Sequence, residues 1–402
     1  MYFVVKKSLR TLRLCVSALK STVSHGKRIV GFLIRGGIAA VVGYCLVVLG
    51  ADWFARWQFG TTIDGDWFLL WMASGTEELR EFWALYWKGI CGTLAAVVLA
   101  WAIAIVAIWR WPKYAVGAIA VAVVVLALGG PARIAGFKPV YFAWDTFLRF
   151  GEYRHLASVV GAERKAERPP LRESGRNRLV ILGESLTSRR MGVYGYPKDT
   201  TPELARLIAE GRLELKPERR ATNQYTARAL MDMMLDDEHT QVWRERADGY
   251  RVVLVSAQDR WERYCGIEQL LFDACDERVY IRQDGKSIYD EELVPAVKKA
   301  MEGHAPWVVY VHMMGSHFLP GERVPEAFRA ANGDKAVGFD DYDWSVLYTD
   351  HVVSQLVRLD PSAEIYFTSD HGESVNAGRW RDPSDEAMWY VPEIASGCAR
   401  AE

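Results

Sequence analysis

The sequence is poor in cysteine and in excess charge of either sign. Its 402 residues include six cysteines, with no CxxC pair and no Cys and His spacing of a zinc finger. Basic and acidic residues balance at 49 against 50, so the net charge of −1 provides no field that would attract nucleic acid. Internal repeats and low-complexity tracts are also missing. These shortages exclude a cysteine-based zinc module, a strongly basic nucleic-acid-binding protein and a repeat protein.

Acidic residues are absent before Asp52, and long apolar runs begin at residue 29. The runs cover 29–51, 89–109 and 114–130, and the last is short for a bilayer that needs about 20 residues. Their lengths predict three membrane spans, and the alternative is three buried core helices. Because the first run is long and other spans follow it, we do not expect a cleavable signal peptide.

The charges around these runs predict how the chain is oriented in the membrane. The residues ahead of the first run are basic, those between the first and second runs are mainly acidic, and the loop 110–113 is basic again. This alternation follows the positive-inside rule and predicts a cytoplasmic N-terminus. Three spans then place the chain after Pro131 outside the cytoplasm.

The chain divides into three predicted parts. Residues 1–132 form a transmembrane domain, 133–178 an amphipathic helix with a linker, and 179–402 a soluble domain. Aromatic and charged residues are interleaved over 142–154, which is typical of a helix on a membrane surface or of one packed against the soluble domain. Residues 161–178 are polar and contain proline, as linkers do.

The soluble part alternates strand and helix patterns. This alternation predicts an α/β domain with a mainly parallel sheet sandwiched by helices. Strands are predicted at 179–182, 250–256, 307–312 and 364–369, and helices at 201–210, 226–236, 289–302 and 343–358.

Acidic and imidazole side chains follow two of the predicted strands. Glu184 comes shortly after 179–182, and Asp370 and His371 come directly after 364–369. Ligands bind outside the carboxyl ends of strands in such sheets, so these three side chains are expected to meet there. Two carboxylates and an imidazole, without a thiolate, suit a divalent metal such as zinc or manganese. Ser185 invites a serine-hydrolase interpretation, but the second glycine of G-x-S-x-G is missing.

Two cysteines lie close together in the part predicted to be exported. Cys265 and Cys275 are candidates for a disulfide, because that compartment is oxidising. Two free thiols are the alternative, since spacing alone does not establish a bridge.

An ordered set of short motifs gives the soluble part a family resemblance. In chain order the motifs are Gly183-Glu184-Ser185, Tyr194-Gly195-Tyr196-Pro197 with Thr200-Thr201-Pro202-Glu203-Leu204, His312-Met313-Met314-Gly315-Ser316-His317, Arg323-Val324-Pro325-Glu326-Ala327-Phe328, Tyr342-Asp343 with Tyr348-Thr349-Asp350, and Ser369-Asp370-His371-Gly372-Glu373-Ser374. The set resembles the catalytic domain of bacterial phosphoethanolamine transferases, which belong to the alkaline phosphatase/sulfatase superfamily. The resemblance covers about 179–392 and the membrane-anchored architecture.

The resemblance implies a threonine nucleophile downstream of Glu184, and Thr226 matches it best. On the residues alone, a hydroxyl at a helix start is commonly a helix cap. As a nucleophile, Thr226 would share a divalent metal, zinc or manganese, with Glu184, Asp370 and His371. The resemblance assigns the phosphoryl group or a second metal to His317, and His312, on the same short segment, is a second candidate for binding substrate.

The resemblance also implies the reaction and its place. Phosphoethanolamine would pass from phosphatidylethanolamine, through a phosphothreonine-type intermediate, to lipid A, lipopolysaccharide core or another envelope glycan. The protein would be a multi-pass protein of the bacterial inner membrane, with its catalytic domain in the periplasm and no nucleic-acid partner.

The sequence also departs from the family pattern. No histidine follows His371, where the family usually has one, and Gly378–Pro383 occupies that region. After Val391-Pro392 the expected apolar strand gives way to 393–402, as in a C-terminally truncated chain. These departures leave three alternatives open: another phosphotransferase or hydrolase of the superfamily, a catalytically impaired relative that binds lipid or glycan, and a purely structural membrane protein.

Overall fold

The computed structural model describes residues 2–74, 76–114, 137–258, 266–282, 289–304, 306–376 and 382–396. The chain forms two compact units. One contains residues 1–54 and 88–143, and the other contains 55–87 and 144–402. The third predicted span, apart from its first residue, lies outside the described residues.

The first unit contains most of two long apolar helices, α1 (Tyr2–Phe59) and α3 (Thr76–Arg110). Within them, Ile29–Phe59 and Leu79–Arg110 are long and apolar enough, by length and composition, to cross a membrane. The two helices pack closely at Gly43, where an added Cβ would lie 2.9 Å from the ring of Trp101. The same indole donates a hydrogen bond to the carbonyl of Ala39 at 2.9 Å. Small residues allow such close approach between membrane helices.

The second unit is built on a seven-stranded sheet in the order β2-β9-β7-β1-β6-β4-β5. Its strands are β1 (Arg178–Gly183), β2 (Leu213–Leu215), β4 (Arg251–Ser256), β5 (Glu277–Tyr280), β6 (Trp307–His312), β7 (Glu364–Ser369) and β9 (Glu393–Ser396). The five strands from β7 to β5 are parallel, whereas β9 is antiparallel to both β7 and β2. A separate two-stranded sheet pairs β3 (Arg219–Arg220) with β8 (Tyr390–Val391).

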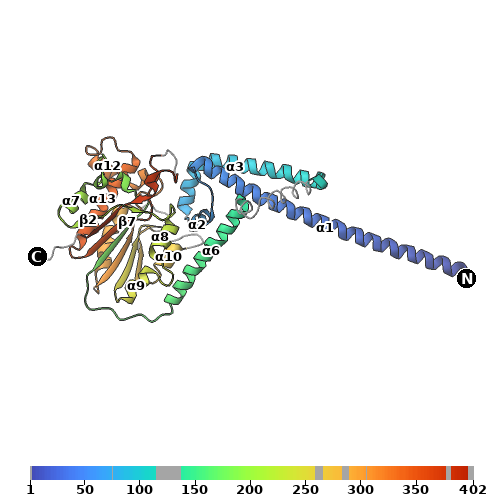
Figure 1. Cartoon of the computed structure of the whole chain (residues 1–402), viewed down its shortest axis with the longest axis horizontal. Helices are drawn as coiled ribbons and strands as arrows, with labels where there is room; N and C mark the ends of the chain where they lie inside the picture. The colour runs from blue at the N-terminus through green and yellow to red at the C-terminus, as the bar shows by residue number, and fades with distance from the viewer. Residues whose placement is uncertain are drawn as a thin grey trace. The chain divides into compact units, whose positions relative to one another are not determined.

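Alternate residues of the central strands enter two hydrophobic cores, one on each face of the sheet. In β4, for example, Val253 and Val255 belong to the first core, and Val252 and Leu254 to the second. The first face is covered by α7 (Pro202–Ala209), α11 (Leu293–Met301) and α13 (Asp341–Leu359). The second is covered by α8 (Thr226–Met234), α9 (Gln241–Ala247), α10 (Ile267–Leu271) and the end of α6 (Lys138–Glu163). Figure 1 shows α7 and α13 on one side of the sheet and α8, α9 and α10 on the other. Burial on both faces explains why these strands are continuous apolar runs.

Near its start, the second-unit part of α6 carries a buried carboxylate and exposed aromatic rings, whereas Leu156 and Val160 near its end are buried in the second core. In its second-unit part, Asp145 is buried, whereas Trp144 and Phe147 are 61% and 66% exposed. Helix α6 extends beyond the predicted 142–154 at both ends, and no regular element is assigned between its end and β1. Water-facing helices have the opposite arrangement, so the outer side of α6 suits an apolar environment.

The segment 55–87, which joins α1 to α3, belongs to the second unit rather than to the helical unit. It contains α2 (Gly65–Ala73) and the buried Phe59, whose ring packs on Trp67, Phe82 and Tyr86 with centroids 5.2 to 6.1 Å apart. The inter-span segment is therefore an integral part of the soluble domain.

The structure confirms the predicted α/β class with a mainly parallel sheet. All four predicted strands and all four predicted helices are present within a few residues of their expected positions, although 289–302 begins with the short 3-10 turn η3 (Asp290–Glu292). The sequence stretch after Pro392, expected to leave the sheet incomplete, instead forms β9 at residues 393–396. Its short, partly polar pattern did not predict a strand because β9 lies near the sheet edge.

Candidate metal and catalytic centre

The candidate centre lies where β1 and β7 end. These neighbouring parallel strands are in register up to the pair Gly183 and Ser369, so both chains leave the sheet at the same level. Glu184 follows the first strand, and Asp370 and His371 follow the second. These three side chains were predicted to meet at one sheet edge. The register between β1 and β7 explains why they do.

The ligand atoms of these three residues converge. One atom from each of Glu184, Asp370 and His371 lies within 4.8 Å of the others, and all three side chains are buried. His371 Nε2 is 3.2 Å from Asp370 Oδ2 and 3.6 Å from Glu184 Oε1. Asp370 Oδ2 is buried without a hydrogen-bond donor among the described residues. Such a concentration of negative charge is what a bound cation would neutralise.

His371 is oriented as a metal ligand would be. Its Nδ1 donates to the carbonyl of Gly372 at 2.7 Å, since a carbonyl oxygen can only accept. This tautomer leaves a lone pair on Nε2, directed at the two carboxylates. A nitrogen lone pair facing carboxylate oxygens suits a cation between them, so the residues fit a divalent metal.

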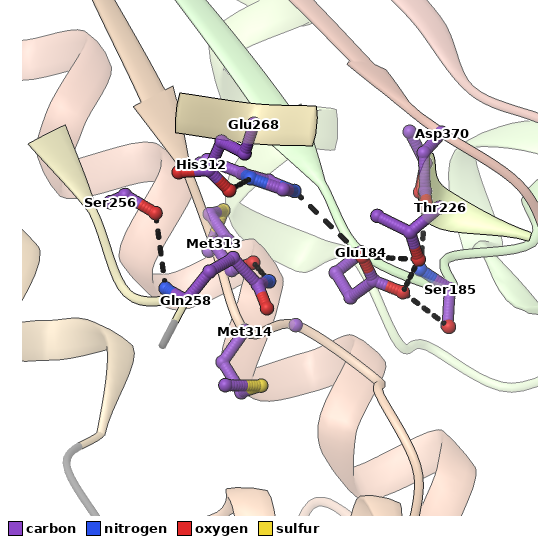
Figure 2. Close-up of polar contacts among 12 residues, drawn as sticks. Glu184, Ser185, Thr226, Ser256, Gln258, Glu268, His312, Met313, Met314 and Asp370 are labelled. Carbon is purple, nitrogen blue, oxygen red and sulfur yellow. Dashed lines mark hydrogen bonds and ion pairs between the residues drawn. The ribbon is translucent and has the colours of Figure 1, made fainter. Parts of the chain in front are cut away.

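Thr226 is the first residue of α8, and its hydroxyl reaches the same cluster. Its Oγ1 is 3.2 Å from both carboxylate oxygens of Glu184 (Figure 2). The same oxygen is 3.4 Å from His371 Nε2. The residue before it, Tyr225, caps α8 without a side-chain hydrogen bond, so Thr226 itself is not the helix cap. A helix N-terminus presents N–H groups without intrahelical partners and favours an anion such as phosphate.

The two carboxyl groups differ in protonation behaviour. Burial, and then repulsion from Asp370, raises the pKa of Glu184. Burial alone would raise the pKa of Asp370 as well, but attraction to the His371 ring in its protonated form, together with backbone hydrogen bonds from His371 and Ser185, outweighs it and lowers that pKa. Asp370 is therefore the more strongly ionised member of the pair.

The turn after β1 is held by backbone contacts. Ser185 has a left-handed φ of 55°, and its N–H donates to Asp370 Oδ1 at 3.0 Å. Tyr342 bridges the turn, because its hydroxyl donates to the carbonyl of Ser185 at 2.6 Å and accepts from the N–H of Thr187 at 2.9 Å. Backbone strain at a site is maintained only where such contacts over-determine it.

A second turn, after β6, supports Glu184 from the other side. Ser316 N–H donates to the carbonyl of Glu184 at 2.9 Å, and Gly315, at φ 52°, approaches so closely that a Cβ would lie 2.6 Å from that oxygen. Asp290 accepts from the N–H groups of Met314 and Gly315 at 2.8 Å each. These contacts explain the glycine of the Met-Gly-Ser-His motif.

His312 lies between two glutamates behind the candidate ligands. Its Nδ1 is 2.7 Å from Glu268 Oε2, and its Nε2 is 3.7 Å from Glu184 Oε2 (Figure 2). Burial would lower the pKa of His312, but Glu268 first and Glu184 second raise it to about 10. His312 therefore acts as a charged support for Glu184, and its predicted contact with substrate stays a prediction.

The remaining predicted residues are placed outside this cluster. His317 is buried, but among the described residues it is not part of the converging ligand set, and its carbonyl accepts from Arg323 at 3.3 Å. The predicted pairing of Cys265 with Cys275 lies outside the described residues, because Cys265 is not among them.

Several residues of the centre carry no signal in the sequence. Glu268 lies in a five-residue helix that matches no motif. Asp290 is followed by two further acidic residues, so the sequence does not show which of the three is the functional one. Arg219, which donates to the carbonyl of Ser369 at 2.8 Å, is one of two adjacent arginines. Only the tertiary structure places these side chains against the strand ends.

Comparison with protein families and curated proteins supports the motif resemblance. Residues 238–393 match the sulfatase family model. The matched range includes His312, Asp370 and His371, but it begins after Glu184 and Thr226. The phosphoethanolamine transferase EptC of Escherichia coli is 25% identical over 279 residues, covering 56% of this chain and 46% of that protein. The Kdo(2)-lipid A phosphoethanolamine 7''-transferase of Escherichia coli is 25% identical over a match that covers 49% of this chain and 39% of that protein. The chain thus spans less than half the length of these relatives.

Solved structures share the fold. The periplasmic domain of Escherichia coli EptC has a TM-score of 0.50 at 23% identity, covering 57% of this chain and 77% of that one. The integral membrane protein EptA of Neisseria meningitidis has a TM-score of 0.53 at 16% identity, covering 89% and 76%. At these identities the likeness establishes the fold, including apolar helices ahead of the sheet domain.

Proposed function

We propose that this chain, which belongs to the phosphoethanolamine transferase family of the alkaline phosphatase/sulfatase superfamily, transfers phosphoethanolamine from phosphatidylethanolamine to an envelope glycolipid or glycan. One observation carries the proposal. The hydroxyl of Thr226, at the start of α8, lies 3.2 Å from both oxygens of a buried glutamate that converges with an aspartate and a histidine. An alcohol needs such an environment to become a nucleophile.

The proposed reaction has two balanced steps. In the first, Thr226 Oγ1 forms a bond to the phosphorus of phosphatidylethanolamine, the bond from phosphorus to the glycerol oxygen breaks, and diacylglycerol leaves with a proton. In the second, a hydroxyl or phosphate oxygen of the acceptor attacks phosphorus, the bond to Thr226 breaks, and the threonine regains its proton. The phosphorus stays a phosphodiester in the product if the acceptor is a hydroxyl.

Each residue of the candidate centre has its own role in the proposed reaction. Glu184 lies within reach of the Thr226 proton, has His312 Nε2 at 3.7 Å, and is supported at its backbone by the Gly315 turn. The free N–H groups of the first turn of α8 favour the phosphate once it is attached to Thr226. A divalent metal held by Glu184, Thr226, Asp370 and His371 would lower the pKa of the threonine hydroxyl and offset charge on the phosphoryl oxygens. The donor set favours zinc, with manganese as the other candidate.

The membrane part of the proposal rests on the second unit. Residues 55–87 and 144–402 form one compact unit, so both belong on the same side of the membrane. The chain crosses once through α3 after residue 87, and a further crossing ahead of residue 144 is then required to bring it back. This reasoning supports the predicted three-span topology with a cytoplasmic N-terminus and a periplasmic catalytic domain. The apolar outer side of α6 would lie at the bilayer surface, near the lipid donor.

The first test is a search for the covalent intermediate. The full chain, purified in detergent, would be incubated with phosphatidylethanolamine and analysed by intact-mass and peptide mass spectrometry. We expect a phosphoethanolamine adduct on the peptide that carries Thr226, lost after metal removal with a chelator and regained with zinc or manganese. Thr226→Ala should abolish the adduct, because it removes the hydroxyl that forms the bond to phosphorus.

Thr222→Ala is the matched control, since Thr222 is exposed in the same loop. It should form the adduct at the wild-type rate. Folded, metal-loaded protein that gives no adduct would contradict the transferase proposal and favour a catalytically impaired relative that binds lipid or glycan. An adduct that survives in Thr226→Ala would reject Thr226 as the nucleophile.

A further inference from the structure

The loop that presents Thr226 is in contact with the helix between the two membrane spans. Two consecutive residues of α2, Asp66 and Trp67, contact the loop residues Asn223 and Tyr225. Asp66 Oδ2 accepts from Asn223 Nδ2 at 3.1 Å, and the rings of Trp67 and Tyr225 lie edge to face with centroids 6.2 Å apart. All of these residues belong to the same compact unit.

The contacts continue to the nucleophile through the backbone. Asn223 uses its amide nitrogen for Asp66, so its Oδ1 is free to accept the N–H of Tyr225, at 3.1 Å. Tyr225 is 2% exposed, and its carbonyl accepts the first helical hydrogen bond of α8, from Ala229 at 2.9 Å. The conformation of the residue immediately before Thr226 is therefore set by Asn223 and by a buried ring. Asp66 determines which way the Asn223 amide faces.

Helix α2 is itself anchored on α6. Asp64 caps α2, because its carboxylate accepts from the N–H groups of Asp66 and Trp67. The N–H of Gly65 donates to Asp145 Oδ2 at 2.6 Å, and a Cβ on Gly65 would lie 2.8 Å from the Asp145 backbone. The glycine therefore permits a contact that a larger residue would prevent.

A guanidinium completes the connection. Arg149 Nε of α6 lies 3.1 Å from Asp66 Oδ1, and Arg149 Nη1 donates to both oxygens of Glu152 at 3.0 Å. Glu152 in turn accepts from Arg228, which is two residues beyond Thr226 on α8. The loop before the nucleophile and the first turn after it are thus both attached to helices that lie next to the membrane segments in sequence. Half-buried ion pairs of this kind fix the positions of their side chains more than they add to the free energy of folding.

We propose that Asp66, with Trp67 beside it, is a positioning residue for the nucleophile: the inter-span helix α2 holds Asn223 and Tyr225 so that Thr226 Oγ1 is kept at Glu184. The proposal rests on the proposed function for its catalytic consequence, whereas the ordering of the loop is independent of any reaction. Nothing in the contact requires Asp66 to touch substrate or metal. The helix between the two candidate spans thereby acts in catalysis by orienting the reactive hydroxyl.

The test combines two readouts on the full chain in detergent. Hydrogen exchange followed by mass spectrometry reports whether the backbone of 223–230 is ordered, and the adduct assay reports how well Thr226 reacts. We expect Asp66→Ala to speed exchange in that peptide about tenfold, as for the loss of one net hydrogen bond, with peptides from β1 and β6 unchanged. The adduct should form about tenfold more slowly at saturating phosphatidylethanolamine, with the half-saturating concentration within about twofold of wild type.

The controls separate positioning from general stability. Asn223→Ala should reproduce the effect from the other partner, and the double variant should add little to either single change, because both remove the same contact. Asp66→Asn keeps an oxygen that can accept from Asn223, and Arg149 keeps its ion pairs with Glu152 and Asp145. This variant should therefore retain most of the protection of 223–230 from hydrogen exchange. Asp237→Ala, an exposed aspartate outside the contacts with α2, should behave as wild type.

Exchange in 223–230 that stays at the wild-type rate in Asp66→Ala would overturn the proposal, as would a uniform rise across the sheet peptides. If wild type forms no adduct but local exchange responds as expected, the proposed function fails and the ordering of the loop stands. If wild type forms the adduct and Asp66→Ala forms it equally fast, the positioning role fails and the proposed function stands.

Discussion

At the scale of single residues, the centre depends on close backbone approaches as much as on its acidic side chains. Glu184 projects from a turn whose carbonyl accepts a hydrogen bond from Ser316, and Gly315 fits against that carbonyl only because it has no side chain. Gly372 is similar, since a Cβ there would lie 2.0 Å from the carbonyl of Ala387. The glycines of both motifs are therefore required by shape.

Gly315→Ala is expected to displace Glu184. The new Cβ would stand 2.6 Å from the Glu184 carbonyl, and the φ of 52° adds a conformational cost of about 1–2 kcal/mol. A displacement of about 1 Å at the reacting group should lower the rate of adduct formation by about 100-fold. Adduct kinetics and the thermal midpoint of the purified chain would measure the two effects.

Gly338→Ala serves as the control for this change. Gly338 also has a positive φ, of 78°, but no atom of the described residues lies within 4 Å of the position that a Cβ would take there. It should lose some stability and keep the wild-type rate. Equal rates in the two variants would show that the Gly315 turn does not hold Glu184.

At the scale of elements, α13 positions α7 through one buried carboxylate. Asp350 accepts from the N–H groups of Glu203 and Leu204 at 2.9 and 2.8 Å, in the first turn of α7. Burial raises the pKa of Asp350 to about 7, although these two hydrogen bonds oppose the rise. The YTD motif of the sequence is thus a helix-to-helix contact rather than part of the reacting centre.

The raised pKa predicts a pH dependence of stability. An unfolded aspartate ionises near its ordinary pKa of 3.8, whereas Asp350 in the folded state ionises near 7. The stability that protonated Asp350 contributes is complete below about 4 and is lost as the pH rises through about 7. Asp350→Asn cannot ionise, so its thermal midpoint should fall less than that of wild type between pH 4.5 and pH 7.5.

Thermal unfolding of both proteins across this range would measure the difference. Asp334→Asn, an exposed aspartate on a loop, should keep the wild-type profile. Parallel profiles for wild type and Asp350→Asn would mean that Asp350 titrates near its ordinary pKa in the folded protein.

At the scale of the whole molecule, residues 55–87 connect the two candidate membrane spans and belong to the compact unit that contains the candidate centre. Within its compact unit this segment contacts the sheet domain at the rings of Tyr86 and Phe318, whose centroids are 6.5 Å apart, and at Arg323, whose Nη2 is 2.9 Å from Glu81 Oε2. In sequence, the two candidate spans therefore flank a part of the unit that contains the candidate centre.

The topology can be tested with reporter fusions. A reporter enzyme that folds only outside the cytoplasm should be active when fused after residue 62 or after the last residue, and inactive after residue 112. The physical reason is the basic, acidic, basic order of the flanking segments. An inactive fusion after residue 62 would reverse the orientation, and an active fusion after residue 112 would remove the crossing through α3.

The sequence by itself determined the parts of this protein that depend on local pattern. Apolar runs of bilayer length, buried strands with apolar residues on both faces and the motifs at strand ends are readable in order along the chain, so the fold class and the set of Glu184, Asp370 and His371 were predicted from it. The motif order likewise pointed to Thr226, although on the residues alone a helix cap was the more ordinary interpretation.

Tertiary structure alone decided which distant residues support that set. His312 pairs with Glu268, Asp290 holds the 314–315 turn, and Asp66 reaches Asn223 across 157 positions of chain. No periodicity marks these partners, because each contact is a single side chain whose neighbour is set by the packing of helices and strands. The strand β9 was missed for a related reason: its short, partly polar pattern forms a strand only because β7 and β2 are there to pair with it.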